Sequence, residues 1–349
     1  MLKIGILGAT GYAGQNLVWL IKHHPNVKLS FVTSRSHKGT MYSDIYPNMK
    51  GSVDLECLDT SNIDASIIRD TDLVFLALTH KSSMGMVKKL LSINPGIKII
   101  DLSADFRIND PKTYEAWYNA PHELVSLIDE FVFGLPEIYA ESVKKASYVA
   151  NPGCYPTASI LALAPAMKAG LIESDVIVDA KSGVSGAGRS AKTANLYCEV
   201  NESVKAYGLF SHRHTPEIAQ ELSLLGGKSS KVVFTPHLVP MNRGILSTCY
   251  GRLKENISSS EMTALYKDFY KGKPFVRVLD NGVFPETRNV RQSNFCDIGL
   301  AVDETSSSLI AVSAIDNLMK GAASQAVQNM NLMLGYDEKS GLDFTPMAP

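Results

Sequence analysis

One cysteine of this sequence lies in a setting that favours reactivity. Cys154 belongs to the stretch VANPGCYPTAS, just before an apolar helical run. Pro156 suits the first turn of a helix, where its missing N–H is not needed, so we expect Cys154 at or just before the helix N-terminus. There the helix dipole and unpaired N–H groups lower the pKa of a thiol, and a thiolate attacks acyl carbonyls. We therefore predict that Cys154 is a nucleophile, and that the same N–H groups could hold a developing oxyanion.

The remaining cysteines do not suggest chemistry. The total of five is odd, and no two are close neighbours in the sequence, so neither a disulfide framework nor a cysteine metal site is indicated. A reducing cytoplasm fits this pattern best. Four cysteines lie in ordinary strand or helix contexts and are interpreted as packing residues: Cys57, Cys198, Cys249 and Cys296.

A cluster of histidines can supply the acid and base that a nucleophilic cysteine needs. Residues 211–218 read SHRHTPEI and include His212, Arg213, His214 and Glu217. Histidine is the usual proton carrier near pH 7, so the cluster favours catalysis. A metal site at His212-x-His214 would lack a third ligand at suitable spacing. A polar turn, with Thr215 as cap and Pro216 in the first helical turn, is the plainer alternative.

A glycine-rich loop follows a predicted strand in the second half of the chain. Residues 182–189 read SGVSGAGR, and its members Ser182, Gly183 and Ser185 precede Arg189. Backbone N–H groups of such a loop can bind an anion, with the guanidinium as a charged clamp. A flexible crossover loop is the alternative interpretation.

The N-terminal stretch predicts a dinucleotide site. Residues 8–14, GATGYAG, come directly after an apolar strand and open a helix. Small residues allow a sharp turn that presents N–H groups to a pyrophosphate. The spacing G-x-x-G-x-x-G departs from the commonest form, and a tight turn that needs glycine for geometry alone is the alternative. The predicted contacts are Gly8, Thr10, Gly11, Tyr12, Ala13 and Gly14.

The second predicted strand favours NADP over NAD. Residues 26–43 contain no Asp or Glu, whereas an NAD site carries a carboxylate for the ribose 2′-hydroxyl. The strand ends instead in Thr33, Ser34 and Arg35, and a hydroxyl with a guanidinium suits a 2′-phosphate. The alternative is that Arg35 is a solvated loop cation.

The elements that must position these residues divide into two patterns. Strands are predicted at 3–8, 27–33, 72–78 and 98–103, with helices near 13–24 and 83–92 between them, which indicates a parallel sheet. After Cys154, a helix over 157–169 is followed by strands at 175–181, 231–241, 244–253, 295–303 and 307–315, which favour a mixed or antiparallel sheet. A last helix is predicted over 316–334. The predicted fold class is α/β: a Rossmann-type NADP-binding domain plus an α+β catalytic domain.

Bulk properties exclude some partner classes. The 349 residues carry a formal net charge of −1, which does not suit nucleic acid or an anionic membrane. No apolar run approaches the length of a membrane span, and the N-terminus is expected to be a strand rather than a signal peptide. Small molecules and further copies of the chain are the expected partners.

Taken together, these motifs resemble one family from end to end, the N-acetyl-gamma-glutamyl-phosphate reductases of arginine biosynthesis. The resemblance is carried by GATGYAG, NPGCYPTA, SGVSGAGR, HRHTPEI, PMNRGILST and AIDNLMKGAASQAVQNMNL, in that order. NPGCYPTA together with HRHTPEI is the most specific part. The resemblance implies NADPH-dependent reduction of an acyl phosphate to a semialdehyde, with release of phosphate.

The resemblance also implies roles for individual residues. Cys154 matches the nucleophile that forms a thioester, and His212 matches the acid/base. His214 and Tyr207 match positions near the site, SGVSGAGR lies by the substrate, and Arg189 or Arg213 could meet its anionic groups. We therefore expect substrate contacts from Ser182, Gly183, Ser185, Arg189, Tyr207, Arg213, His214 and Glu217.

For the cofactor and the assembly, the resemblance implies the following. Ser34 and Arg35 match 2′-phosphate contacts, and Asn317 matches a residue near the nicotinamide. Leu78 and His80 belong to LALTH, where the family often has Pro-His, so Thr79 replaces a proline in a loop near the cofactor. The late helix returns to the nucleotide domain, giving domains of 1–150 plus 316–349 and of 151–315. A homodimer or homotetramer is implied.

Three rival interpretations remain from the sequence. A sister reductase for a longer or carrier-bound acyl phosphate would share these motifs. Aspartate-semialdehyde dehydrogenase shares the fold but differs around the cysteine and the histidines. A non-catalytic NADP-binding sensor would have no reason to keep Cys154 together with the histidine cluster.

Overall fold

The computed structural model describes residues 1–347 of the chain. It contains two compact units, of which the first is Met1–Pro152 with Ala322–Asp343, and the second is Gly153–Gly321 with residues 344–347. The chain therefore passes from one unit to the other just before Cys154 and again just before residue 322. The functional domains named above, 1–150 plus 316–349 and 151–315, stay a prediction.

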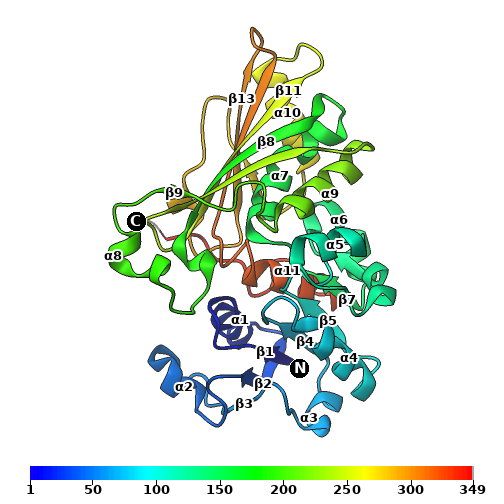
Figure 1. Ribbon diagram of the computed structural model, residues 1–349, viewed down its shortest axis with the longest axis vertical. Coiled ribbons are helices and arrows are strands. Elements are labelled where there is room, and N and C mark those ends of the chain that lie inside the picture. The colour runs from blue at the N-terminus through cyan, green and yellow to red at the C-terminus, as the bar shows by residue number, and fades with distance from the viewer. Residues whose placement is uncertain (348–349) are drawn as a thin grey trace. The chain divides into compact units, whose positions relative to one another are not determined.

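The first unit is built on a seven-stranded sheet in the order β3-β2-β1-β4-β5-β7-β6, and all its paired strands are parallel. This confirms the parallel sheet that strand–helix alternation predicted. Three of its strands have only three residues, too few to show a periodic pattern. The strands are β1 Leu2–Leu7, β2 Val27–Ser34, β3 Cys57–Asp59, β4 Leu73–Leu76, β5 Lys98–Asp101, β6 Phe131–Phe133 and β7 Tyr148–Ala150 (Figure 1).

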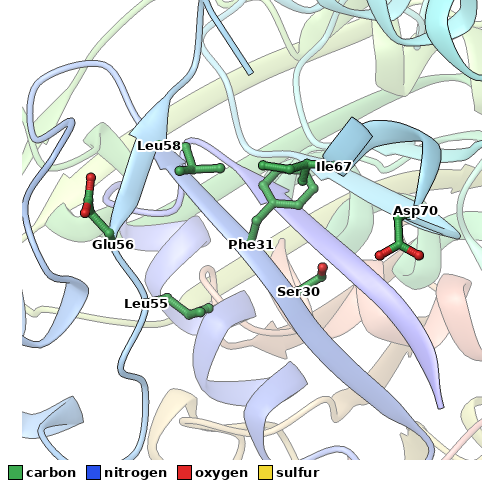
Figure 2. Close-up of a pocket in the computed structure, with 7 residues that line it drawn as sticks. All are labelled: Ser30, Phe31, Leu55, Glu56, Leu58, Ile67 and Asp70. Atoms are coloured by element: carbon green, nitrogen blue, oxygen red, sulfur yellow. The ribbon is translucent and has the colours of Figure 1, made fainter. Parts of the chain in front are cut away.

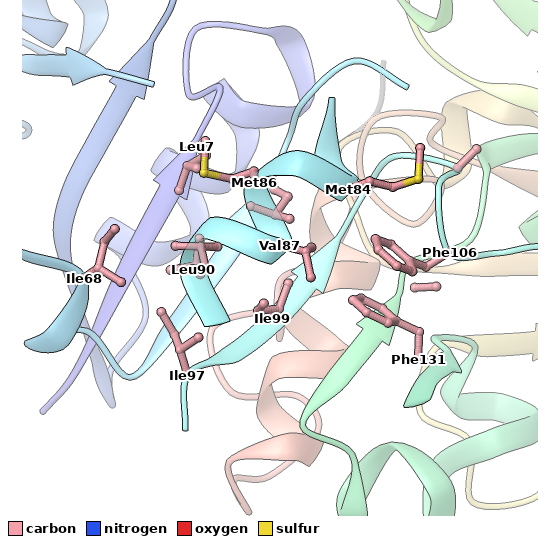
Figure 3. Close-up of a cluster of buried hydrophobic side chains, with 14 of the residues drawn as sticks. Leu7, Ile68, Met84, Met86, Val87, Leu90, Ile97, Ile99, Phe106 and Phe131 are labelled. Carbon is pink, nitrogen blue, oxygen red and sulfur yellow. The ribbon is translucent and has the colours of Figure 1, made fainter. Parts of the chain in front are cut away.

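Helices cover this sheet and close its core. Figure 3 shows a cluster of buried apolar side chains in which Leu90 and Val87 of α4 face Ile99 of β5. Phe106 and Phe131 stack there with ring centroids 3.9 Å apart. The helices are α1 Tyr12–Lys22, α2 Tyr42–Ile45, η1 Pro47–Met49, α3 Ala65–Arg69, α4 Ser83–Ile93, α5 Pro111–Tyr118, η2 Val125–Glu130, α6 Pro136–Lys145 and α11 Ala323–Met333.

The last helix begins later than its sequence pattern predicts. We expected it over 316–334, but α11 begins at Ala323, because Ala322 has φ −158° and ψ −86° and is therefore not helical. Before it, the carboxylate of Asp316 accepts the N–H groups of Leu318 and Met319 in a separate turn. From Ala323 on, the helix packs against α1 and α6 of the first unit. The segment 316–321 belongs to the second unit.

The second unit is built on a mixed sheet in the order β12-β13-β14-β11-β8-β10-β9. The pairs β8–β10 and β12–β13 are parallel and the other pairs are antiparallel, which confirms the predicted mixed sheet. Its strands are β8 Ile172–Gly183, β9 Lys205–Ala206, β10 Val232–Val239, β11 Ile245–Leu253, β12 Val276–Val278, β13 Cys296–Asp303 and β14 Ser308–Ile315 (Figure 1).

One apolar helix supports this second sheet. Every residue of α7 from Tyr155 to Met167 is buried, and the helix packs against β8, β11 and β14. The helices of this unit are α7 Cys154–Lys168, η3 Val184–Ala187, η4 Thr193–Asn195, α8 Tyr197–Val200, α9 Thr215–Gly226, α10 Ser259–Phe269 and η5 Thr287–Asn289.

The cysteines outside α7 follow the packing interpretation with one exception. Cys57, Cys249 and Cys296 are buried. Cys198 is exposed on the short helix α8, so its interpretation as a packing residue is wrong. Within residues 1–347, no helix has the length and apolar character needed to cross a membrane.

Candidate active site

The predicted pyrophosphate loop lies at the carboxyl end of β1, between β2 and β4 of the parallel sheet. Gly8 has a φ of +78°, and a Cβ there would lie 2.3 Å from the carbonyl oxygen of Ala77. A Cβ on Gly14 would lie 2.4 Å from the carbonyl oxygen of Gly8. Gly11 caps α1, whose first residues are Tyr12 and Ala13, so the N–H groups of this first turn are available for an anion. The loop therefore fits a dinucleotide phosphate.

Tyrosines that the sequence gave no reason to single out fix this loop. Tyr42 donates its hydroxyl hydrogen to the carbonyl oxygen of Ala9 at 3.2 Å, and Tyr46 donates to that of Thr10 at 2.8 Å. Both lie outside the glycine motif, and no local signal connects them with it. These bonds occupy carbonyl oxygens only, but the N–H groups of Gly8 and Ala9 are also bonded within the protein, so the N–H groups of the first turn of α1 are the candidates for a ligand.

The residues predicted to contact the 2′-phosphate end the neighbouring strand β2. Ser34 is buried, and its hydroxyl lies 2.8 Å from that of Thr10 and accepts the N–H of His37 at 3.2 Å. Arg35 is exposed beside it. The structure thus brings Thr10, Ser34 and Arg35 together at the carboxyl ends of adjacent strands.

The loop after β4 carries the predicted cofactor contacts Leu78 and His80, both half-buried. His80 accepts the N–H of Ala104 through Nδ1 at 3.0 Å. The hydroxyl of Thr79, which stands where the family often has proline, lies 3.1 Å from that of Ser82. A local side-chain bond therefore restrains this loop in place of a proline ring.

Two buried carboxylates hold the end of that loop. Asp105 accepts the N–H groups of Lys81 at 2.8 Å and Ser83 at 3.1 Å, and Asp101 accepts the Ser83 hydroxyl at 2.8 Å. Burial, followed by the charge of Asp105, raises the pKa of Asp101 to about 6. The sequence alone does not indicate this support, since an Asp after a strand has many possible partners.

In the second unit, Cys154 is the first residue of α7, as the position of Pro156 predicted. Gly153 caps the helix with φ −69° and ψ 156°, and its carbonyl oxygen accepts both the N–H and the hydroxyl of Thr157 at 2.9 Å. Cys154 is half-buried, and its Cβ faces Gly321, where an added Cβ would approach it to 2.7 Å. The thiol therefore starts a buried helix with its first-turn N–H groups around it.

Aromatic rings surround His212. Its ring lies 5.6 Å from that of Tyr155, 5.5 Å from that of Tyr207 and 5.2 Å from that of Phe234, centroid to centroid. Burial, followed by the charge of Arg213, lowers the pKa of His212 to about 4. Its Nδ1 accepts the N–H of His214 at 3.1 Å, so the neutral ring carries its proton on Nε2.

The tyrosine hydroxyls form a pair within this cluster. Tyr207 is 36% exposed, yet its hydroxyl oxygen lies 3.0 Å from that of Tyr155. Burial raises the pKa of Tyr207 to about 12 and that of Tyr155 further still, and a thiolate at Cys154 adds to both shifts. Both hydroxyls therefore stay protonated and can act as hydrogen-bond donors. Tyr155 was not among the predicted site residues, although it directly follows Cys154.

The first turn of α9 lies against Gly153. His214 is the N-cap of α9, one residue before the predicted cap Thr215, and its ring occupies the space beside Gly153. Glu217 is 1% exposed, and its Oε1 accepts the N–H of Gly153 at 2.7 Å. Arg213, between the two histidines, is exposed.

The loop predicted to bind an anion is held by Asn317. Asn317 donates from Nδ2 to the Ser185 hydroxyl at 2.9 Å and accepts the N–H of Gly244 through Oδ1 at 2.8 Å. Ser182 is buried at the end of β8, next to Gly183. Arg189 is exposed at the far end of the loop. Asn317 was predicted to lie near the nicotinamide, and it lies in the second unit with both ends of its amide engaged.

A buried ion pair, which sequence reasoning missed, fixes the turn that carries Asn317. Asp316 is fully buried, and Arg243 donates to its two carboxylate oxygens at 3.3 and 3.2 Å. Asp316 also accepts the N–H of Gln292 at 2.7 Å. The turn over 316–321 is therefore a rigid support for both the anion loop and the Cys154 side of the site.

Outside these clusters, a surface pocket of about 290 Å³ lies beside β2 and β3, lined among others by Phe31, Leu58 and Ile67 (Figure 2). None of the predicted site residues lines it. Among residues 1–347, no three His, Cys, Asp or Glu side chains are grouped as a metal site would require.

Comparisons with known families match both halves of the chain. Residues 3–146 match the semialdehyde dehydrogenase NAD binding domain, and residues 154–317 match the semialdehyde dehydrogenase dimerisation domain. Among solved structures, aspartate semialdehyde dehydrogenase II from Vibrio cholerae, complexed with ASA, aligns with a TM-score of 0.72 and 18% identity. The alignment covers 96% of this chain and 98% of that chain. At that identity, the likeness shows the shared fold, which confirms the predicted fold class.

Full-length relatives are far more similar in sequence. The N-acetyl-gamma-glutamyl-phosphate reductase of Clostridium novyi is 51% identical over 348 residues, covering 99% of both chains. That of Geobacter sp. strain M21 is 50% identical over 351 residues, with both chains fully covered. That of Campylobacter jejuni is 51% identical over 346 residues, covering 98% of both. The chain belongs to the N-acetyl-gamma-glutamyl-phosphate reductase family and is an oxidoreductase with a nicotinamide-cofactor domain.

Proposed function

We propose that this chain reduces N-acetyl-glutamyl 5-phosphate to N-acetyl-glutamate 5-semialdehyde in arginine biosynthesis, with NADPH as reductant and a thioester on Cys154 as intermediate. The observation that carries the proposal is the position of Cys154 as the first residue of α7. Its relatives at about half identity are named for this reaction.

The first step needs a thiolate. Its sulfur attacks the acyl carbon, the bond from that carbon to the phosphate oxygen breaks, and phosphate leaves. The N–H groups of the first turn of α7 favour the thiolate and can hold the oxyanion of the tetrahedral intermediate. The anionic groups of the substrate would be received by the loop 182–189 and by Arg189 or Arg213.

Reduction of the thioester needs a hydride, which a bound reduced nicotinamide supplies, and a proton for the carbonyl oxygen. We assign the acid and base roles to His212: its ring takes up the proton that the Cys154 thiol loses in the first step, and the resulting imidazolium donates its Nε2 proton to the carbonyl oxygen. In the neutral ring Nε2 carries the only proton and Nδ1 accepts the N–H of His214, so proton uptake at Nδ1 replaces that bond. When the resulting hemithioacetal collapses, the semialdehyde leaves and Cys154 recovers its thiol.

We propose NADP rather than NAD because of the end of β2. Thr10 and Ser34 bring two hydroxyl groups together beside the exposed Arg35, and neither Asp nor Glu lies between residues 26 and 43. Gly8, Gly11 and Gly14, with Tyr12 and Ala13, would hold the pyrophosphate. Leu78, His80 and Asn317 are proposed as contacts further along the cofactor.

We also propose that two copies associate, at least as a homodimer. The family match over 154–317 is described as a dimerisation domain. The mixed sheet presents exposed apolar side chains on neighbouring strands: Ile177 is 48%, Val233 43% and Tyr250 38% exposed. Sedimentation equilibrium of the wild-type chain and of a Tyr250→Asp variant would test this proposal.

The reaction is tested in reverse, with N-acetylglutamate semialdehyde, phosphate and NADP, followed at the nicotinamide absorbance. Longer and shorter semialdehydes run beside it. We expect the acetylglutamate compound to give the highest kcat/KM. A higher value for a longer semialdehyde would assign the chain to the sister reaction instead.

A further inference from the structure

We infer that Glu217 is a positioning residue that fixes the turn before Cys154, and not a contact for the substrate. This inference rests on the proposed function, since it assigns Glu217 a place in the same thiol chemistry. It replaces the substrate-binding role that the sequence pattern suggested for this residue.

The central observation is a buried hydrogen bond between elements far apart in the sequence. The carboxylate of Glu217 accepts the N–H of Gly153, the N-cap residue of α7, at 2.7 Å. Glu217 is 1% exposed, so this bond forms where water does not compete. A bond to a charged acceptor is stronger than one between neutral groups, and its loss would leave a buried N–H unpaired.

The second observation is that the N–H group, the carbonyl oxygen and the open side of Gly153 are each restrained by a neighbouring residue. Its N–H donates to Glu217, its carbonyl oxygen accepts from Thr157, and a Cβ added to it would lie 2.5 Å from Nε2 of His214. The backbone angles of Gly153 set the direction in which the Cα–Cβ bond of Cys154 leaves the helix. Glu217 therefore helps to fix the direction in which the side chain of Cys154 leaves the backbone.

The helix dipole favours a negative charge at the location of Glu217. This residue lies in the first turn of α9, close to the positive end of that helix dipole. The proposed substrate carries negative charge on its phosphate, so a direct contact with a carboxylate would be repulsive. Positioning through a main-chain N–H avoids that contact.

The inference is tested with Glu217→Met, which removes the acceptor at similar size, and Glu217→Gln, which keeps an acceptor. Glu221→Met is the matched control, because Glu221 lies one turn further along α9, is also 1% exposed, and binds Gln220. For each variant, kcat and KM are measured in the reverse assay. The rate at which iodoacetamide alkylates Cys154 is measured by peptide mass spectrometry, without substrate or cofactor.

We expect Glu217→Met to lower kcat by about 10- to 100-fold with little change in KM, as displacement of a reacting group does. Alkylation of Cys154 should slow several-fold. Glu217→Gln should restore kcat to within about fivefold of wild type, because a neutral acceptor still binds the N–H. Glu221→Met should leave kcat and the alkylation rate unchanged.

An increase in the substrate KM at constant kcat, in either Glu217 variant, would overturn the inference in favour of substrate binding. If Glu217→Met does not fold, the KM and kcat of Glu217→Gln decide. Alkylation needs no turnover, so an inactive wild type would count against the proposed function, whereas unchanged alkylation in folded Glu217→Met would count against Glu217 alone.

Discussion

The ring of His214 lies directly against Gly153, in space that any other residue would need for its side chain. A Cβ on Gly153 would lie 2.5 Å from Nε2 of His214, 2.8 Å from Cε1 and 2.9 Å from Cδ2. Gly153 has a φ of −69°, which any residue adopts, so its glycine is required by this contact and not by backbone conformation. The residue before the nucleophile and the histidine cluster are thus in van der Waals contact.

Gly153→Ala should displace His214 while the backbone stays as it is. We expect the free energy of unfolding to fall by about 1–3 kcal/mol from overpacking, and kcat to fall by about 10- to 100-fold. Urea unfolding and the reverse assay measure the two effects. Gly85→Ala is the control, because Gly85 lies on the exposed face of α4 and a Cβ added there has no atom within 4 Å. In this variant activity should be unchanged and the free energy of unfolding should rise by about 0.5–1 kcal/mol. Wild-type activity in Gly153→Ala would contradict the contact.

Cys154→Ser should abolish turnover and leave NADPH binding intact, because a serine at this position has no thiolate to offer. We expect kcat to fall by about 10³-fold or more, with an unchanged dissociation constant for NADPH by fluorescence titration. Cys198→Ser, at the exposed cysteine of α8, is the control and should behave as wild type. Near-normal activity in Cys154→Ser would refute the thioester.

Arg35→Ala should raise the KM for NADPH far more than the KM for NADH. A guanidinium at a 2′-phosphate contributes about 1.5–3 kcal/mol, or roughly 10- to 100-fold in affinity, and NADH lacks that phosphate. Lys38→Ala is a suitable control, since Lys38 is a nearby cation that pairs with Asp59 at 3.2 Å. Equal effects of Arg35→Ala on both cofactors would refute the role in binding the 2′-phosphate.

His212 should make stability depend on pH in the acid range. Its pKa is lowered from 6.5 to about 4 by burial and by Arg213, so the folded state holds it neutral. The unfolded chain takes up a proton first as pH falls, and the stability present above pH 6.5 is lost toward pH 4, on the order of 3 kcal/mol. Urea unfolding from pH 7 to 4.5 should show a smaller decrease for His212→Gln than for wild type.

Some of that decrease will remain in His212→Gln. Burial also lowers the pKa of His24 and of His122, so both contribute with the same sign. His23→Gln, at an exposed position, is the control, and its free energy of unfolding should decrease with falling pH as much as that of the wild type. If the free energy of unfolding of His212→Gln decreased between pH 7 and 4.5 as much as that of the wild type, His212 would have to be solvated in the folded protein.

Local signals in the sequence were sufficient to predict those parts of the fold that depend on a few neighbouring residues. Pro156 located the start of α7, and with it Cys154, because a proline fits the first turn of a helix without loss of a hydrogen bond. Alternation of strands and helices was sufficient for the parallel sheet of the first unit. The short strands β3, β6 and β7 were missed, because three residues cannot display a period.

The glycine loop shows where local reasoning ends. Its glycines were recognisable from their spacing, and Gly8 indeed has positive φ. The hydroxyl groups of Tyr42 and Tyr46 that bind its carbonyl oxygens come from 33 and 36 residues further along the chain. Nothing near either tyrosine indicates that partner.

By itself the sequence determined which reactive groups are available. These are a thiol at the start of a helix, two histidines in one cluster, a glycine-rich turn, and a hydroxyl and a guanidinium in a stretch without Asp or Glu. Only the tertiary structure decided how these groups are held. Glu217 reaches Gly153 across 64 positions, and Asn317 reaches Ser185 across 132. Such bonds depend on which helix ends and turns meet when the two sheets form, and residue spacing along the chain does not contain that information.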